Sequence, residues 1–187
     1  MTAVDNLWFL ADEAAQQAER TYHDLASDHD DYLEVTLDRR VSRDRFRTVA
    51  RRIRDNGLPY GAHTVTYRSG GELLLVRHED VDLWVLPGGE VDEGETFREC
   101  ARRELAEETG VEARFSGVGI LARVEFHTAD HDTWGVLPIY EARAETTDLT
   151  VADPDGEISD AAWFADLPPD TRDRAELCRW RERRFDD

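Results

Sequence analysis

The chain has 187 residues, of which 40% are hydrophobic, enough to bury a core in one domain with an appendage or in two small domains. It carries 42 acidic residues against 23 lysines and arginines, a formal net charge of −19, and this charge disfavours binding to nucleic acid or to anionic lipid. The longest unbroken aliphatic run, Leu73 to Val76, is far too short for a bilayer helix.

The composition also bears on where the protein works. All 23 of these basic residues are arginine, and an acidic chain without lysine favours a halophilic source, because concentrated salt screens the repulsion between acids. An ordinary acidic protein from a GC-rich genome is the alternative. Cys100 and Cys178 are too few for a disulfide framework, so we expect free thiols in a reducing cytoplasm. The first ten residues lack a basic leader and include Asp5, which argues against a signal peptide.

The N-terminal part is predicted to be mostly helical. Apolar residues recur at helical spacing over 5–26, and the polar cluster 27–31 ends that helix. Alternation over 33–37 predicts a short strand, with the entry to a helix as the alternative. Ser42 is the expected N-cap of a second helix, which stops at Gly57.

The pattern changes from helical to strand-like at Leu58-Pro59-Tyr60-Gly61. This change predicts a boundary between an N-terminal helical extension, 1–57, and a second domain, 58–187. Beyond it, Ser69-Gly70-Gly71 is typical of a hairpin turn. Hairpins and an excess of strands over helices favour an α+β fold over a doubly wound sheet. Strands are expected at 63–67, 72–77, 83–86, 118–126, 134–142 and 161–164, and helices at 96–110 and 171–185.

The helix expected at 96–110 carries the most informative charges. Thr96 and Glu99 form a capping-box pattern at its start. Glu104, Glu107 and Glu108 are spaced i, i+3, i+4, which puts three carboxylates on one face. Such crowding destabilises a helix unless a cation lies among the carboxylates, and hard oxygen ligands suit Mg²⁺ or Mn²⁺. A solvated acidic face is the alternative.

The wider spacing resembles a known motif. Gly89 is followed after five residues by Glu95 and, after seven more, by Arg103-Glu104-Leu105-Ala106-Glu107-Glu108-Thr109-Gly110-Val111. This looks like a complete Nudix box, in which every fixed position is filled. The resemblance implies the Nudix fold, a mixed-sheet α/β/α sandwich, and hydrolysis of a diphosphate linked to a further group, commonly a nucleoside.

The resemblance also implies roles for individual residues. Glu104 and Glu108 would be the principal ligands of Mg²⁺ or Mn²⁺, with Glu107 ligating directly or through water and the carbonyl of Gly88 as a further ligand. Glu104 would be the usual candidate to activate water. In the same motif Arg103 would orient the glutamates, Glu95 would be its structural partner, and Gly89 and Gly110 would be structural positions.

An acidic residue and an arginine-rich segment are two further candidates for a functional role. Glu157 lies in an acidic loop six residues before Trp163, and this looks like the downstream acid that ligates a metal or acts as general base in some relatives. One more acid in an acidic loop is the alternative. Arg39 to Arg54 holds eight arginines, and its apolar residues favour a docking helix over a nucleic-acid-binding one.

Together these features predict a cytoplasmic, metal-dependent hydrolase of a nucleoside diphosphate derivative, such as a nucleotide sugar, ADP-ribose or a modified nucleoside triphosphate. A small nucleotide is the expected partner, a homodimer is possible, and neither nucleic acid nor membrane is expected. Two alternatives remain open: a pyrophosphohydrolase of RNA 5′ ends, and a nucleotide-sensing regulator that acts through residues 1–57. Substrate-binding residues are not identified by the sequence.

Overall fold

The computed structural model describes residues 6–186, and the chain divides into two compact units. The first unit contains the residues up to Gly61 together with 121–138, and the second contains 62–120 and the residues from 139 onward. Two long strands, β6 (Ala113–His127) and β7 (Asp132–Ala144), contribute a part to each unit. None of the helices within 6–186 is both long and apolar enough to cross a membrane.

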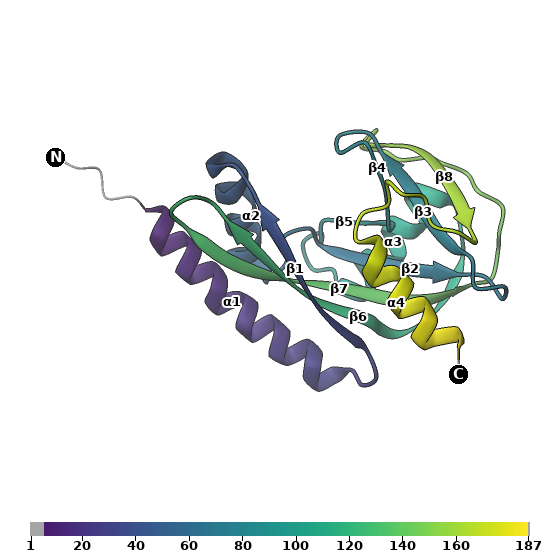
Figure 1. The fold of residues 1–187 in the computed structure, drawn as a ribbon, viewed down its shortest axis with the longest axis horizontal. Helices are drawn as coiled ribbons and strands as arrows, with labels where there is room; N and C mark the ends of the chain where they lie inside the picture. The colour runs from purple at the N-terminus through teal and green to yellow at the C-terminus, as the bar shows by residue number, and fades with distance from the viewer. Residues whose placement is uncertain (1–5, 187) are drawn as a thin grey trace. The chain divides into compact units, whose positions relative to one another are not determined.

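The first unit combines two helices with a three-stranded sheet of order β1-β6-β7 (Figure 1). Helix α1 (Leu7–Asp28) and strand β1 (Leu33–Arg40) confirm the first two predicted elements, although Asp5, where the helix was expected to begin, lies outside the described residues. Helix α2 (Arg43–Asn56) packs against α1. The β6–β7 hairpin falls within the range 58–187 predicted for the second domain, but its tip belongs to this unit.

Local sequence explains the limits of α2. The Ser42 hydroxyl accepts a hydrogen bond from the N–H of Arg45, and Gly57 ends the helix in the left-handed conformation, as expected for these residues. The apolar face expected of this helix is completely buried and consists of Phe46, Val49, Ala50 and Ile53. Two of its arginines pair with acids of the same helix, Arg47 with Asp44 and Arg54 with Asp55.

The second unit is a mixed sheet with a helix on each face. Its strands are β2 (Ala62–Tyr67), β3 (Leu73–His78), β4 (Leu83–Val85), β5 (Gly88–Gly89) and β8 (Ile158–Phe164), with parts of β6 and β7. The order is β6-β7-β2-β3-β4, β5 pairs with β2, and β8 pairs with β3. Strands β2 and β7 pair in parallel, whereas the pairings of β2 with β3 and β5 and of β3 with β4 and β8 are antiparallel.

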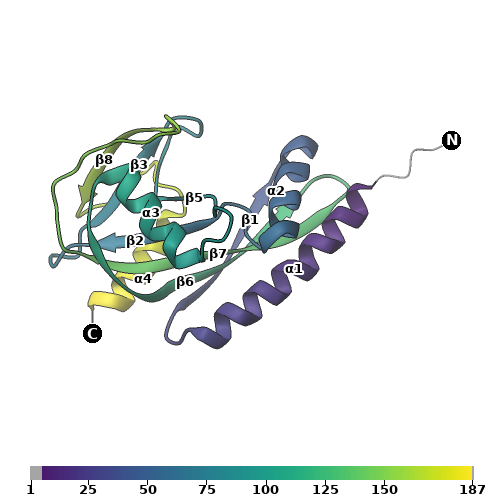
Figure 2. The ribbon, with the colours of Figure 1, turned by 180° about the vertical axis from the view of Figure 1, so that it is seen from behind.

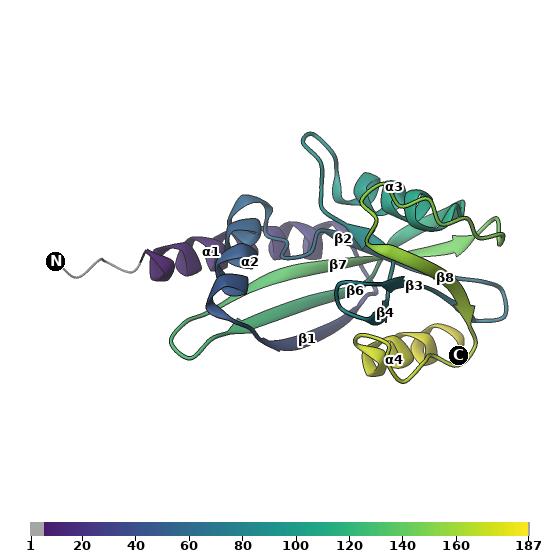
Figure 3. The same cartoon turned by 90° about the horizontal axis from the view of Figure 1, so that it is seen from above.

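The two helices of this unit are α3 (Phe97–Thr109) and α4 (Arg174–Phe185). They lie on opposite faces of the sheet, and the α/β/α sandwich expected from the sequence is therefore confirmed (Figure 3). Helix α3 packs over β2 and β5 (Figure 2). On the other face, the Trp180 ring of α4 lies 6.0 Å from the ring of Tyr67. The core between these layers includes Leu73, Leu74, Leu75, Leu105 and Ile120.

Several limits of elements differ from the prediction, for identifiable reasons. Gly88 and Gly89 lie beyond the strand expected at 83–86, but they pair with His63 and Ala62 as strand β5. The tail helix was expected from Thr171, which instead forms an isolated bridge with Trp84, so α4 begins only at Arg174. Strands β6, β7 and β8 are longer than their apolar runs because backbone pairing continues through polar residues.

Candidate functional site

Helix α3 is fixed at both ends, so its polar face has a defined position. The Thr96 hydroxyl accepts the N–H of Glu99 at 3.2 Å, and the Glu99 carboxylate accepts the N–H of Thr96 at 2.8 Å, which completes the predicted capping box. Gly110 closes the helix in the left-handed conformation.

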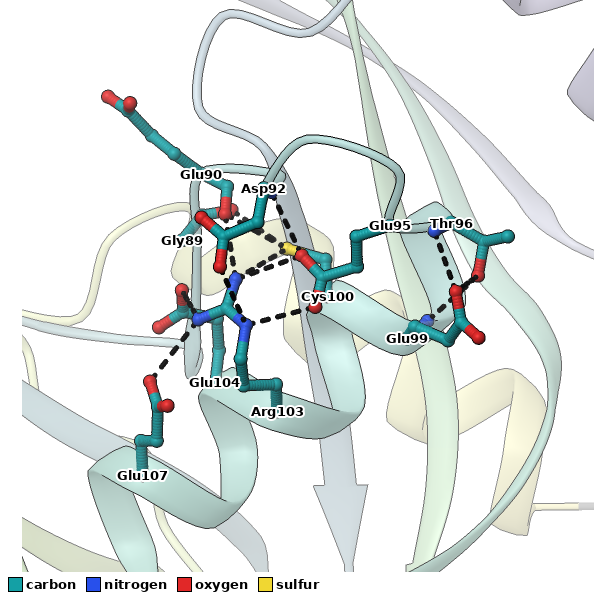
Figure 4. Close-up of polar contacts among 10 residues, drawn as sticks. All are labelled: Gly89, Glu90, Asp92, Glu95, Thr96, Glu99, Cys100, Arg103, Glu104 and Glu107. Carbon is teal, nitrogen blue, oxygen red and sulfur yellow. Dashed lines mark hydrogen bonds and ion pairs between the residues drawn. The ribbon is translucent and has the colours of Figure 1, made fainter.

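Arg103 lies at the centre of the polar face and bonds to three glutamates (Figure 4). Its Nε and Nη2 donate to the two carboxylate oxygens of Glu95 at 2.9 and 3.0 Å, a bidentate pair. Its Nη1 donates to Glu104 at 2.7 Å and to Glu107 at 3.2 Å. A further Nη2 contact reaches the carbonyl oxygen of Glu90 at 3.0 Å. One guanidinium therefore holds carboxylates from the loop and from two turns of α3.

The charged groups around Arg103 shift one another's pKa values, some upward and some downward. Hydrogen bonding to Arg103 lowers the pKa of Glu95, and hydrogen bonding to Glu95 raises the pKa of Arg103. Burial raises the pKa of Glu104 in spite of its contact with Arg103, and the neighbouring charges of Glu107 and Asp155 add to that rise. Glu104 is therefore a carboxylate whose negative charge is only partly compensated by the chain.

The negative charge of Glu108 is compensated by the chain even less than that of Glu104. It is 6% exposed, and its Oε2 accepts a hydrogen bond from the N–H of Gly88 at 3.1 Å. Burial, together with the acidic groups of Glu104, Asp153 and Glu157, raises the pKa of Glu108 to about 9, against the opposing effect of the Gly88 N–H. No arginine or histidine within residues 6–186 forms an ion pair with it. A buried carboxylate among other carboxylates fits a hard divalent cation.

The two glycines of β5 allow the close approach of strand and helix. A Cβ on Gly89 would lie 2.5 Å from Oε1 of Glu104, and one on Gly88 would lie 2.5 Å from Cγ of His63 and 2.6 Å from the carbonyl oxygen of Ala62. Side chains at these positions would displace either Glu104 or the backbone that donates to Glu108. The glycines therefore shape the carboxylate site directly.

Glu157 belongs to the same electrostatic neighbourhood, because its charge acts on Glu108. Its Oε2 lies 3.4 Å from Nε2 of His78, and the Asp153 carboxylate accepts the N–H groups of Glu157 and Ile158 at 2.6 and 2.8 Å. The pairing with His78 and the bracing by Asp153 were missed from the sequence. The turn signal Asp153-Pro154-Asp155-Gly156 could have indicated the second of these.

Two buried groups near β5 have no place in an acid–base reaction. The Cys100 thiol contacts the carbonyl oxygens of Gly89 and Glu90, and burial raises its pKa to about 12. Burial lowers the pKa of His63 to about 4, and its Nδ1 has no hydrogen-bond partner within residues 6–186. Both groups therefore stay neutral near pH 7.

A second group of possible metal ligands lies in the first unit. In the part of the chain that the structure describes, Asp38, Glu125 and His127 are the one set of three such side chains whose ligand atoms all lie within 4.8 Å of one another. His127 Nε2 is 3.0 Å from Asp38 Oδ2, so an ordinary ion pair accounts for the contact. The glutamates on α3 do not form so tight a set within residues 6–186; two of them, Glu104 and Glu107, bond to Arg103.

The chain is similar to known proteins of one family. Residues 57–179 match the family model described as the NUDIX domain. A protein of Bacillus subtilis (strain 168) described as a candidate 8-oxo-dGTP diphosphatase is 39% identical over 89 residues, which cover 47% of this chain and 60% of the relative. An RNA pyrophosphohydrolase of Bartonella clarridgeiae is 47% identical over 47 residues, covering 24% of this chain and 27% of the relative.

Among solved structures, a NUDIX hydrolase from Nitrosomonas europaea superposes with a TM-score of 0.50 at 17% identity, covering 66% of this chain and 70% of that chain. This likeness concerns the fold. The two curated relatives above match over 60% of their length or less.

Proposed function

Because the chain belongs to the Nudix family, we propose that it hydrolyses a diphosphate linkage in a nucleoside diphosphate derivative by attack of water on phosphorus. The observation that carries the proposal is the environment of Glu108, a buried carboxylate with acidic neighbours and no cationic partner within residues 6–186. Such a site gains stability from a divalent cation, and an anionic diphosphate needs a cation to approach it.

The residues proposed to hold Mg²⁺ or Mn²⁺ are Glu104 and Glu108, with Glu107 directly or through water and the carbonyl of Gly88 as a further ligand. Their donor atoms are all hard oxygens, which fits these ions. When bound, such an ion would neutralise phosphoryl charge and lower the pKa of water.

The chain itself would supply orientation and a proton acceptor. Arg103 would hold Glu104 and Glu107 in place, and Glu95 would hold Arg103, consistent with their hydrogen bonds. Glu104 or Glu157 would accept the proton of the attacking water, and both remain candidates for the general base. Glu157 is already positioned by His78 and Asp153.

The pH dependence of kcat can separate these two candidates. If Glu157 is the base, Glu157→Gln removes the acidic limb of the kcat profile and lowers the plateau, while metal binding is preserved. If Glu104 is the base, the limb persists in Glu157→Gln. Asp80→Asn, in the neighbouring turn, is the matched control, because it removes one exposed carboxylate whose charge does not act on Glu108.

The substrates we propose are a nucleotide sugar, ADP-ribose or a modified nucleoside triphosphate. The resemblance to the Bacillus subtilis relative supports the last of these, although that match includes only part of either chain. A panel of nucleotides incubated with the protein in molar KCl and Mg²⁺ or Mn²⁺, followed by analysis of the phosphate-containing products, tests the proposal. Metal-dependent release of product from one class supports it, whereas a folded sample inactive on the whole panel contradicts it.

A hydrolase of RNA 5′ ends is the second candidate, favoured by the RNA pyrophosphohydrolase relative and by the arginines of α2. In that case RNA binding would weaken steeply with salt, and the slope would fall when Arg51 and Arg52 are replaced. A nucleotide-sensing regulator would instead bind nucleotide with no turnover in the parent protein, and Glu108→Gln would retain its ligand response.

We also propose that residues 1–57 serve the catalytic domain, 58–187, as a docking, dimerisation or regulatory extension. The buried apolar face of α2 supports a docking role for that helix within its own unit. Sedimentation of the whole chain distinguishes a homodimer from a monomer. A halophilic source and a cytoplasmic location remain part of the proposal, on the grounds of composition.

A further inference from the structure

The first unit contains a cleft that takes no part in the proposed hydrolysis. Its volume is about 460 Å³, and α1, β1, β6 and β7 contribute its walls. Figure 1 shows α1 running alongside these strands. Every lining residue belongs to the first unit: Glu19, Tyr22, Glu34, Val35, Thr36, Arg123 and Trp134.

The aromatic wall of the cleft is held in place by a ring contact and a hydrogen bond. Trp134 is 8% exposed, and the Tyr22 ring meets it edge to face with centroids 6.2 Å apart. The Tyr22 hydroxyl donates to Oε1 of Glu34 at 2.6 Å. Burial and this acidic contact raise the pKa of Tyr22 to about 12, so the hydroxyl stays protonated and fixed as a donor. The ring and the Glu34 carboxylate are therefore held in one arrangement.

The charges of the cleft are not balanced within it. Its single arginine, Arg123, stacks on the Trp134 ring at 3.7 Å from the centroid and donates to Glu125, outside the lining, at 3.0 Å. Neither carboxylate of the lining pairs with an arginine within residues 6–186: Glu34 accepts from Tyr22, and Glu19 lies 3.5 Å from His23. The Arg123 charge also acts on Tyr22, but Arg123 is shared with Glu125, so the lining carries two exposed carboxylates against one shared arginine, beside an aromatic ring.

We propose that this cleft is a binding site for a small organic amine, which Glu19 and Glu34 would hold through its ammonium groups against the Tyr22 ring. Ammonium groups donate hydrogen bonds to carboxylates and are attracted to aromatic faces, so this lining matches such a cation. The volume lies within the range of about 300–1,000 Å³ that is typical of small-molecule sites, which favours a small ligand over a protein segment.

Spermidine is a suitable probe, and calorimetric titration of the whole chain at about 0.15 M salt measures its binding while long-range attraction is screened. Because the chain is strongly acidic, the matched control must remove the same charge elsewhere on α1. Glu13→Gln does so, since Glu13 is exposed and outside the cleft. Glu34→Gln and Glu19→Gln test the cleft. In Glu34→Gln the amide oxygen of the new side chain can still accept from Tyr22, so the local fold is kept.

We expect saturable binding of one spermidine per chain, unchanged in Glu13→Gln and weakened about tenfold or more in Glu34→Gln, with a loss in Glu19→Gln as well. An acetylated, uncharged analogue should not bind. Equal losses of spermidine affinity in Glu13→Gln and Glu34→Gln would show that binding depends only on the net charge of the chain, and would overturn the proposal. The absence of saturable binding to the parent chain, or an unaltered affinity in Glu34→Gln, would overturn it equally. The outcome is independent of nucleotide hydrolysis.

Discussion

Arg103 is the residue on which the other charged groups of α3 depend for their positions. It is charged at any accessible pH, and its planar fork satisfies Glu95 with two bonds while Nη1 reaches Glu104 and Glu107. A lysine at this position would supply the positive charge but not the planar arrangement of hydrogen-bond donors. The geometry around the metal-binding glutamates is therefore expected to depend on the shape of this side chain as well as on its charge.

For this reason Arg103→Lys should lower kcat by about tenfold to a hundredfold, because Glu104 and Glu107 lose their fixed partner. Arg102→Lys is the control: Arg102 neighbours Arg103 on α3, but its guanidinium lies over the Phe115 ring and away from the glutamates. Steady-state kinetics on the substrate found in the panel, with circular dichroism to check the fold, measures both. A kcat for Arg103→Lys equal to that of the parent would contradict this role.

His63 should make the protein sensitive to acid. Its pKa is lowered from 6.5 to about 4 by burial, so between these values the unfolded chain binds the proton and the folded chain does not. The free energy of unfolding contributed by this group is complete above pH 6.5 and is lost as pH falls toward 4. At pH 4.5 the loss should be about 2 to 3 kcal/mol.

Urea unfolding at pH 7 and pH 4.5 measures this contribution when the parent is compared with His63→Asn. The decrease in stability between the two pH values should be smaller in His63→Asn by the stated amount. His23→Asn replaces a histidine whose side chain is 76% exposed and should behave like the parent. The same acid sensitivity in all three proteins would mean that other groups are responsible.

At the scale of the elements, the site depends on how closely β5 approaches α3. The approach is possible because Gly89 lacks a side chain, since a Cβ there would lie 2.5 to 2.8 Å from the carboxylate of Glu104 and its carbon. Strand β5 is itself only two residues long and is held by its pairing with β2. Even a small side chain added to this strand would therefore displace Glu104, a proposed metal ligand on the helix.

Gly89→Ala should accordingly lower kcat by about a hundredfold through displacement of Glu104. The helix itself should remain, because its capping box and its C-terminal Gly110 are untouched. Gly70→Ala serves as the control, because the new Cβ would meet only the far end of the Glu72 side chain, away from the glutamates of α3. Kinetics and circular dichroism distinguish the expected local effect from unfolding. Full activity in Gly89→Ala would show that the close approach is not needed.

The elements also show which features the sequence could predict. Helices α2 and α3 could be placed almost to the residue, because Ser42, Thr96, Gly57 and Gly110 act within a few residues of themselves. The carboxylate face of α3 followed from spacing for the same reason. The contact of Glu108 with Gly88 joins residues that are twenty apart and depends on the packing of β5, which local patterns do not encode.

Long-range pairing explains the remaining differences. Glu157 was singled out by its place before a Trp-Phe strand, but its contact with His78 arises from the β3–β8 pairing and could not be read from either segment alone. The cleft of the first unit draws on four elements, α1 and β1 near the N-terminus and β6 and β7 some ninety residues later, so no single motif could have indicated it.

For the molecule as a whole, the net charge of −19 is the dominant property. Acids outnumber arginines by 19, and many acidic side chains must therefore face one another across water at the surface. Raising KCl from about 0.1 M to about 1 M shortens the screening length from about 10 Å to about 3 Å, so their repulsion should decrease. The midpoint of urea unfolding should rise over this range, and a constant or falling midpoint would contradict the halophilic interpretation.

We propose that the carboxylates of α3, and Glu108 above all, support metal-dependent hydrolysis of a diphosphate. The most direct measurement compares turnover in Glu108→Gln and Glu112→Gln, in molar KCl with Mg²⁺ or Mn²⁺. Each variant loses one carboxylate, but Glu112 is exposed and lies outside the site. We expect Glu112→Gln to match the parent and Glu108→Gln to lose turnover while remaining folded. Turnover of Glu108→Gln at the rate of the parent would contradict the claim.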